Sequence, residues 1–212
     1  MPPFSGWVTP RILSQRWHQK NLPILENKPQ TIEKFKSPKE SRVSITELML
    51  PSHSNFSGKV HGGHILNLMD QIAFACSSKH SQCYCVTASV NKVDFLNPIE
   101  VGDLVTLRAS VNYTGRTSMV VGVRVESENI TTGKKKHCNS SYFTMVAKGK
   151  DGKSAAIPGL IVENEQGVRR FKRSMRRKEQ AAKRSTNYDQ SSFKIEEHIA
   201  DLNSENVKID FS

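Results

Sequence analysis

Apolar and polar residues alternate along four long stretches in the central part of the chain. The stretches are CVTASVNKVDFL (85–96), LVTLRASVNYT (104–114), SMVVGVRVESEN (118–129) and HCNSSYFTMVAKG (137–149). A period of two is typical of β-strands that bury one face. The stretch RVSITELML (42–50) begins with the same alternation and predicts an earlier strand.

Between the first strand and the next, the apolar period becomes that of a helix. Within residues 64–79, apolar side chains occupy most of a helical circumference: Ile65, Leu66, Leu68, Met69, Ile72, Ala73, Ala75 and Cys76. This pattern predicts a helix that is enclosed on most sides. One strand, one helix and four long strands predict an α+β fold in which an antiparallel sheet wraps around a central helix. The remaining face and edges of such a sheet need cover, which favours a dimer or a larger assembly.

The two ends of the chain differ from this predicted domain, which spans residues 41–165. Residues 1–40 mix prolines, lysines and isolated apolar residues, and predict an irregular arm with one short helix. Residues 166–212 predict a basic, partly helical extension. Its apolar positions form a thin helical stripe of Val168, Phe171, Met175 and Ala182.

Positive charge is concentrated in that extension. The formal net charge is +11, and residues 169–184 hold nine Lys or Arg against a single acid, Glu179. A segment of this kind suits nucleic acid, an anionic membrane surface, a polyanionic ligand or a solvated, oligomer-packing helix. Nucleic acid is the weaker of these interpretations because no helix-turn-helix pattern is present. The membrane interpretation has little apolar area to support it.

Cysteine usage and the absence of long apolar runs indicate the class of protein. None of Cys76, Cys83, Cys85 and Cys138 forms a C-x-x-C pair, so we expect reduced thiols and no metal site. No run is long enough for a signal peptide or a membrane span, which favours a cytoplasmic enzyme or binding protein. Residues 1–20 are basic and free of acids, so an organelle transit peptide stays open, although two early prolines argue against it.

Two features around the predicted helix suggest chemistry. Gly62 and Gly63 stand where the helix should begin, and they let another molecule approach the first-turn amides, although an ordinary tight turn would also explain them. Asp70 lies two turns further on among apolar residues. Burying a carboxylate is costly unless the group is paired or useful, and burial would favour a general base. Alternatively, Asp70 faces a subunit seam or caps a neighbouring strand.

Three segments together resemble the acyl-CoA thioesterases of the hotdog fold: NFSGKVHGGHILNLMDQIAFA (55–75), DFLNPIEVGDLVTLRASVNYTGRTSMVVGVRVESEN (94–129) and YFTMVAKGKDGKSAAIP (142–158). The resemblance covers roughly residues 42–165 and leaves the arm and the basic extension outside it. It implies a hotdog fold and a homo-oligomer in which dimers assemble into a hexamer. It also implies hydrolysis of fatty acyl-CoA to fatty acid and CoA, with no cofactor beyond the CoA that the substrate carries.

The same resemblance implies the site residues. Asn55 of one protomer and Asp70 of the other would form the catalytic pair, with Asp70 as general base or, less favoured, as nucleophile. Asn55 would orient the water or the thioester. The backbone amides of Gly63 and His64 would polarise the thioester carbonyl, with the His64 side chain exposed.

For substrate binding, the resemblance implies a pocket lined by His61 and Gly62. It further implies that Arg116, Thr117 and Ser118 contact the CoA phosphates, a chemistry that suits a guanidinium and hydroxyls. Without the family, this segment reads as a hairpin turn with a basic tip. Lys148 and Lys150 have the right sign to add charge there. The alternative functions are a dehydratase or hydratase, whose loop and helix context fits less well, and a non-catalytic acyl-CoA sensor whose basic tail binds nucleic acid.

Overall fold

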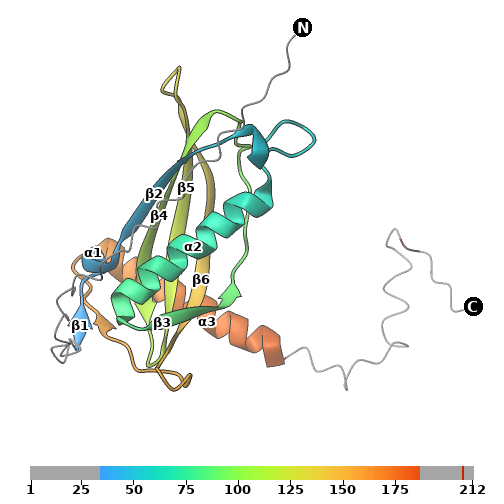
Figure 1. The fold of residues 1–212 in the computed structure, drawn as a ribbon. Coiled ribbons are helices and arrows are strands. Elements are labelled where there is room, and N and C mark those ends of the chain that lie inside the picture. The colour runs from blue at the N-terminus through green and yellow to red at the C-terminus, as the bar shows by residue number, and fades with distance from the viewer. Residues whose placement is uncertain (1–33, 187–206, 208–212) are drawn as a thin grey trace, which may run out of the picture. The chain divides into compact units, whose positions relative to one another are not determined.

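The computed structural model describes residues 34–186 and residue 207, and its centre is a curved antiparallel sheet. The sheet has five strands in the order β2-β4-β5-β6-β3. Their bounds are β2 (Val43–Leu48), β3 (Tyr84–Val90), β4 (Asp103–Thr114), β5 (Ser118–Asn129) and β6 (Lys135–Lys148). Helix α2 (Gly62–Ser81) lies along one face of this sheet (Figure 1). The predicted α+β arrangement of a sheet around a helix is therefore confirmed.

Shorter elements flank the sheet. They are β1 (Phe35–Lys36), α1 (Pro38–Ser41), the 3-10 turn η1 (Pro51–His53) and β7 (Gly159–Leu160). β1 pairs in parallel with β7, so the segments before and after the main sheet meet. A capping box holds α1, because the Ser37 side chain accepts from the Lys39 amide and Glu40 accepts from the Ser37 amide.

The hydrophobic core fills the space between α2 and the sheet. The helix contributes Ile65, Met69 and Ile72, each at most 1% exposed. Alternate residues of the central strands meet them from the sheet, among them Val105, Leu107, Val121, Val123, Phe143 and Met145. Because strand side chains alternate between faces, the intervening polar residues point to the outer face of the sheet.

One face of α2 is not covered by the rest of the described chain. Leu66 and Phe74 are 36% and 38% exposed, and Asp70 lies exposed between them. The prediction of a helix enclosed on most sides, with a buried Asp70, is therefore wrong for the single chain. Positions 66, 70 and 74 are successive members of an i, i+4 row, so they form one stripe. We call Leu66, Asp70 and Phe74 the exposed stripe of α2.

The stripe lies on the side of strand β3, which is an edge strand of the sheet. The predicted strand 85–96 is shorter in the structure, because the ladder with β6 shifts register between Thr87 and Ser89 and ends at Val90. Beyond it, the backbone and side-chain nitrogens of Asn91 both donate to the carbonyl of Tyr142. The Tyr84 ring, 65% exposed, packs edge-on against Phe74. A free strand edge and an apolar helix stripe thus adjoin each other.

Helix α3 (Glu165–Thr186) lies against the opposite, outer face of the sheet (Figure 1). Its Phe171 ring packs on Tyr113 with 4.9 Å between centroids, and Ser174 is fully buried. Phe171 and Met175 of the predicted stripe face inward, whereas Val168 is 59% exposed. The side chain of Ala182, the arm 1–33 and most of 187–212 lie outside the described residues. Among the described helices, none is long and apolar enough to span a membrane.

Candidate functional site

The loop before α2 fixes the side chain of Asn55. Its Oδ1 accepts hydrogen bonds from the Ser57 amide at 2.9 Å, the Ser57 hydroxyl at 2.8 Å and the Lys59 amide at 3.2 Å. These bonds saturate the oxygen and make the loop an Asx turn. The Asn55 amide nitrogen has no hydrogen-bond partner among the described residues, so it presents two donors outward.

His61 is the N-cap of α2, and it accepts hydrogen bonds from the two amides that were expected to bind the thioester oxygen. The Gly63 amide donates to His61 Nδ1 at 3.1 Å, and the His64 amide donates to the His61 carbonyl at 3.0 Å. The His64 amide is thus committed to the backbone, which corrects the expectation for that residue. The Gly62 amide, by contrast, has no partner within the described part of the chain.

Close packing against Phe95 explains why position 62 is a glycine. A Cβ built on Gly62 would lie 3.2 Å from the Phe95 ring, which is tighter than an ordinary contact. Phe95 therefore packs directly on the first turn of α2. A cavity of about 370 Å³ opens beside this contact, and its lining includes Asn55, Gly62, Ile65, Phe95 and Ile99. The cavity joins the Asn55 loop to the helix start, with His61 beside it.

The carboxylate of Asp70 is held by a residue that the sequence interpretation missed. Thr87 of β3 donates its hydroxyl proton to Asp70 Oδ1 at 2.6 Å. One signal was available in the sequence: Thr87 lies two positions after the buried Cys85, so strand alternation directs it toward α2. The bond fixes one carboxylate oxygen and leaves the other free to accept a proton.

Asn55 and Asp70 do not meet within one protomer. Asp70 follows Gly62 by eight helical residues, about 12 Å along the axis, and it does not line the cavity beside Asn55. The predicted CoA contact is also remote from Asn55. Strand β5 carries Ser118 at one end and Asn129 at the other, and the Asn55 loop adjoins the Asn129 end through Lys59 and Glu100.

The segment 115–117 is a turn between β4 and β5, and neighbouring segments hold it. The carbonyls of Arg116 and Thr117 accept from the amides of Ile157 at 3.1 Å and Ala147 at 3.0 Å. The Arg116 side chain is exposed. Ser118 Oγ accepts from Lys178 Nζ of α3 at 3.0 Å. The turn therefore displays the exposed guanidinium of Arg116 beside a lysine that the basic extension supplies.

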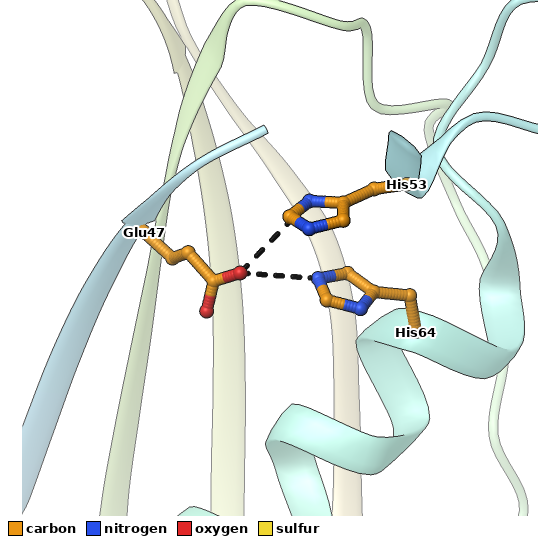
Figure 2. A group of neighbouring side chains, drawn as sticks. All are labelled: Glu47, His53 and His64. Carbon is orange, nitrogen blue, oxygen red and sulfur yellow. Dashed lines mark hydrogen bonds and ion pairs between the residues drawn. The ribbon is translucent and has the colours of Figure 1, made fainter. Parts of the chain in front are cut away.

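A cluster of Glu47, His53 and His64 lies at the start of α2 (Figure 2). His64 Nε2 donates to Glu47 Oε1 at 3.2 Å, and His53 Nδ1 accepts the Leu50 amide at 3.3 Å. The His64 side chain is 22% exposed, so the expectation of an exposed side chain is wrong. The two rings stack with 3.9 Å between centroids. The lone pairs of stacked rings lie in nearly parallel planes, whereas the ligands of a metal ion point toward one centre. We therefore interpret the cluster as a support for the start of α2.

The cysteines take no part in this chemistry. All four are free thiols, as expected. Burial raises the pKa of the Cys76 thiol to about 12, and it raises the pKa of Cys138 as well. A nucleophilic cysteine needs a lowered pKa, so neither of these thiols has the character of a nucleophile.

Comparison with known proteins identifies the family. A model of the thioesterase superfamily matches residues 57–134. Protein VdlD of Helicobacter pylori is 42% identical over 139 residues, which are 66% of this chain and 79% of that protein. The chain belongs to the thioesterase superfamily.

Two solved structures extend the likeness over about three quarters of the chain. The crystal structure of an apo-hexameric acyl-CoA thioesterase is 38% identical, covers 72% of this chain and 97% of its own, and has a TM-score of 0.70. An acyl-CoA hydrolase of Staphylococcus aureus, solved with butyryl coenzyme A and coenzyme A, is 30% identical. It covers 74% of this chain and 96% of its own, with a TM-score of 0.69. The expected hotdog acyl-CoA thioesterase family is confirmed.

Three variants of the Staphylococcus aureus thioesterase have also been solved. Alanine replaces an Asn in one, an Asp fifteen positions later in another, and a Thr a further seventeen positions later in the third. Asn55, Asp70 and Thr87 of this chain have the same spacing.

Proposed function

We propose that this thioesterase hydrolyses fatty acyl-CoA to free fatty acid and CoA, in sites shared between two protomers. The observation that carries the proposal is the exposed Asp70 carboxylate, which Thr87 holds on an apolar stripe beside a free strand edge. An exposed apolar surface and an unpaired edge favour a partner chain. A second copy that pairs along β3 would enclose Asp70 and bring its own Asn55 loop toward it.

Each residue then has a chemical role. The free oxygen of Asp70 accepts a proton from water as the water oxygen attacks the thioester carbonyl carbon. Asn55 Nδ2 orients the water or the thioester. The Gly62 amide of the protomer that supplies Asn55 donates a hydrogen bond to the developing oxyanion. The Gly63 amide of that protomer adds a second hydrogen bond once the His61 imidazole, its present partner, turns away. The carbon–sulfur bond breaks, and the CoA thiolate takes up the proton.

The remaining expectations follow the same assembly. We propose that Arg116, Thr117 and Ser118 bind the CoA phosphates at a site to which a different protomer supplies Asn55, because the two regions lie at opposite ends of β5. The hexameric relative supports a hexamer built from dimers. The hydrolysis uses no cofactor beyond the CoA of the substrate, and the proposed location is the cytoplasm.

The test is thiol release from butyryl-CoA and palmitoyl-CoA by wild type and by single variants. Asp70→Asn should lower kcat by about 10²- to 10⁴-fold while CoA binding is kept. Asn55→Ala should lower it by a similar factor. Thr87→Val should lower kcat by about tenfold, because the carboxylate loses a charge-assisted hydrogen bond. Gln71→Ala, an exposed neighbour of Asp70, is the matched control and should leave turnover unchanged.

Mixing the inactive variants tests the shared site. When Asp70→Asn and Asn55→Ala chains are refolded together, half of the dimers are mixed, and each mixed dimer has one intact site. Activity should return to about one quarter of wild type. No recovery would mean that both residues act within one chain. Binding of acyl-CoA by wild type without any turnover would instead favour the non-catalytic sensor.

A further inference from the structure

Helix α3 and the outer face of the sheet enclose a cleft whose lining is rich in arginine. The cleft has a volume of about 190 Å³, and its lining residues are Tyr142, Gln166, Arg169, Arg170, Arg173 and Arg177. A wider groove of about 670 Å³ adjoins it along the outer face and shares Tyr142, Gln166 and Arg170 with it. The groove adds Arg42, Arg108 and Arg124 to the lining. Among the described residues, no carboxylate lines either cavity.

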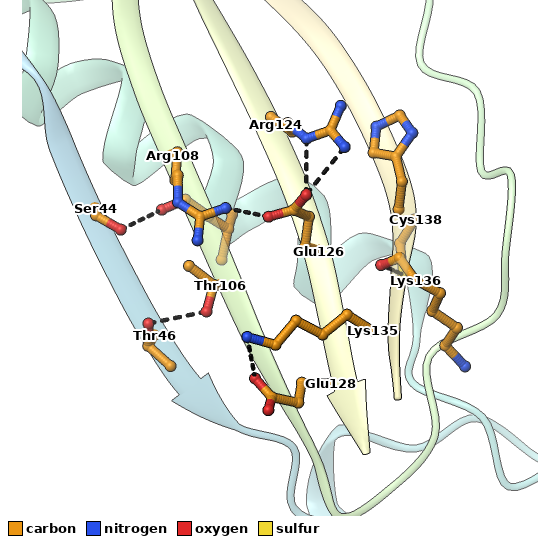
Figure 3. A network of polar contacts seen from close by, with 12 residues as sticks. Ser44, Thr46, Thr106, Arg108, Arg124, Glu126, Glu128, Lys135, Lys136 and Cys138 are labelled. Atoms are coloured by element: carbon orange, nitrogen blue, oxygen red, sulfur yellow. Dashed lines mark hydrogen bonds and ion pairs between the residues drawn. The ribbon is translucent and has the colours of Figure 1, made fainter. Parts of the chain in front are cut away.

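Two of the acids near these cavities are already paired, and a third, the exposed Glu165 at the start of α3, shares a surface pocket with Arg169 and Arg173. Glu126 accepts from both Arg108 and Arg124 on the outer face (Figure 3), and the two guanidiniums hold the pKa of its carboxyl below the usual range. One carboxylate thus faces two guanidiniums, which leaves a net positive charge. Glu163 pairs with Lys39 at 2.5 Å. Neither of the two paired acids has capacity to neutralise the arginines of the cleft.

Most of the arginines that line the cleft and the groove form no ion pair with another described residue. Among the described residues, Arg42, Arg169, Arg170, Arg173 and Arg177 form no ion pair. The Arg177 guanidinium is held in place all the same, because it lies 3.7 Å from the centre of the Tyr142 ring. Like charges held around one concavity raise its potential and attract an anion.

We propose that this arginine cleft and its groove bind a small anion that carries two or more phosphate groups. Guanidinium groups match phosphate oxygens with paired hydrogen bonds. Gln166, which lines both the cleft and the groove, adds a neutral donor. The concave shape, closed over by a helix, admits a phosphate chain and excludes the broad surface of a bilayer or a nucleic-acid duplex. The site lies on the face of the sheet opposite Asp70, so the inference does not rest on the proposed hydrolysis.

The experiment is calorimetric titration of the full chain at about 0.15 M salt, with inorganic tripolyphosphate and with CoA as separate probes. Saturable binding of about one tripolyphosphate per protomer is expected. The double variant Arg170→Gln, Arg177→Gln should weaken it by about tenfold or more. The matched control Lys172→Gln, Arg176→Gln removes the same charge from the same helix, at positions that line neither cavity, and should stay within about twofold.

A second variant separates binding from docking of the helix. Arg169→Gln, Arg173→Gln leaves the contact between Arg177 and Tyr142 intact and should also weaken tripolyphosphate binding by about tenfold. If CoA competes with tripolyphosphate and binds more tightly, the phosphates that the cleft binds are those of the CoA nucleotide; without competition they come from a free polyphosphate. Equal losses in cleft and control variants, or no saturable binding to wild type, would overturn the proposal. So would binding of duplex RNA or anionic vesicles that tripolyphosphate fails to displace.

Discussion

Helices α2 and α3 are of similar length and lie on opposite faces of one sheet, yet different forces hold them. The 20-residue α2 buries nine side chains against the sheet, and its charges are confined to Asp70 and to the last turn. The 22-residue α3 docks through a few contacts: Phe171 on Tyr113, Arg177 on Tyr142, Lys178 on Ser118 and the buried Ser174. Core packing thus fixes the position of α2 and the bond from Thr87 holds the Asp70 carboxylate, whereas α3 carries much of its positive charge on exposed side chains.

The largest expected effect is on the buried face of α2. Ile72→Ala should lower the free energy of unfolding by about 2–5 kcal/mol, because Ile72 is 1% exposed and its removal leaves a cavity. Urea denaturation monitored by circular dichroism measures the change. Gln71→Ala, on the exposed side of the same turn, should change it by less than about 0.5 kcal/mol. An equal loss of unfolding free energy at positions 72 and 71 would contradict the distinction between the packed and the exposed face of α2.

This difference in forces also explains which elements the sequence predicts. Periodicity reflects burial, so α2 and three of the four long strands were expected close to their observed bounds, whereas the strand predicted over 85–96 ends at Val90. The same reasoning misjudged the exposed stripe, because Leu66 and Phe74 are apolar and yet exposed in the single chain. An apolar residue that faces a partner has the same pattern as one that faces the core.

The candidate site shows the same limit at the level of single bonds. The resemblance indicated Asn55 and Asp70, but hydrogen bonds depend on where separate elements meet. The bond from Thr87 to Asp70 joins a strand to a helix, and the occupation of the Gly63 amide depends on the rotamer of His61. Strand alternation places Thr87 on the α2 side of its strand but does not identify Asp70 as its partner, and the contact of the Gly63 amide has no local sequence signature. Gly62, interpreted as room for another molecule, packs against Phe95 of the same chain.

A smaller effect is expected for α3. Phe171→Ala should cost about 1 kcal/mol, the value of one aromatic pair at a half-buried position. Because few other contacts hold the helix, the loss should appear as local opening. Hydrogen exchange should accelerate in the amides of α3 and stay unchanged in α2. Val168→Ala, at an exposed position one turn earlier, is the control. Accelerated exchange in both helices would show that α3 and α2 unfold as one unit.

The smallest expected effect concerns pH and the buried end of α2. Burial lowers the pKa of His80 below its ordinary value of 6.5, although the carbonyl of Pro158, which accepts from Nε2 at 3.3 Å, acts in the opposite direction. Above pH 6.5 both the folded and the unfolded chain hold this imidazole neutral. Below that value the unfolded chain binds a proton that the folded protein resists, so the free energy of unfolding falls as the pH falls.

His80→Gln removes the titrating group while keeping a side chain that can donate to the Pro158 carbonyl. Urea denaturation at about pH 7.5 and about pH 5.5 should show a smaller loss of stability for this variant than for wild type. Other histidines titrate in both proteins, so the comparison rests on the difference between the two losses. An equal loss of stability in the two proteins would mean that the buried end of α2 tolerates a charged imidazole. The two helices would then differ only in their apolar packing.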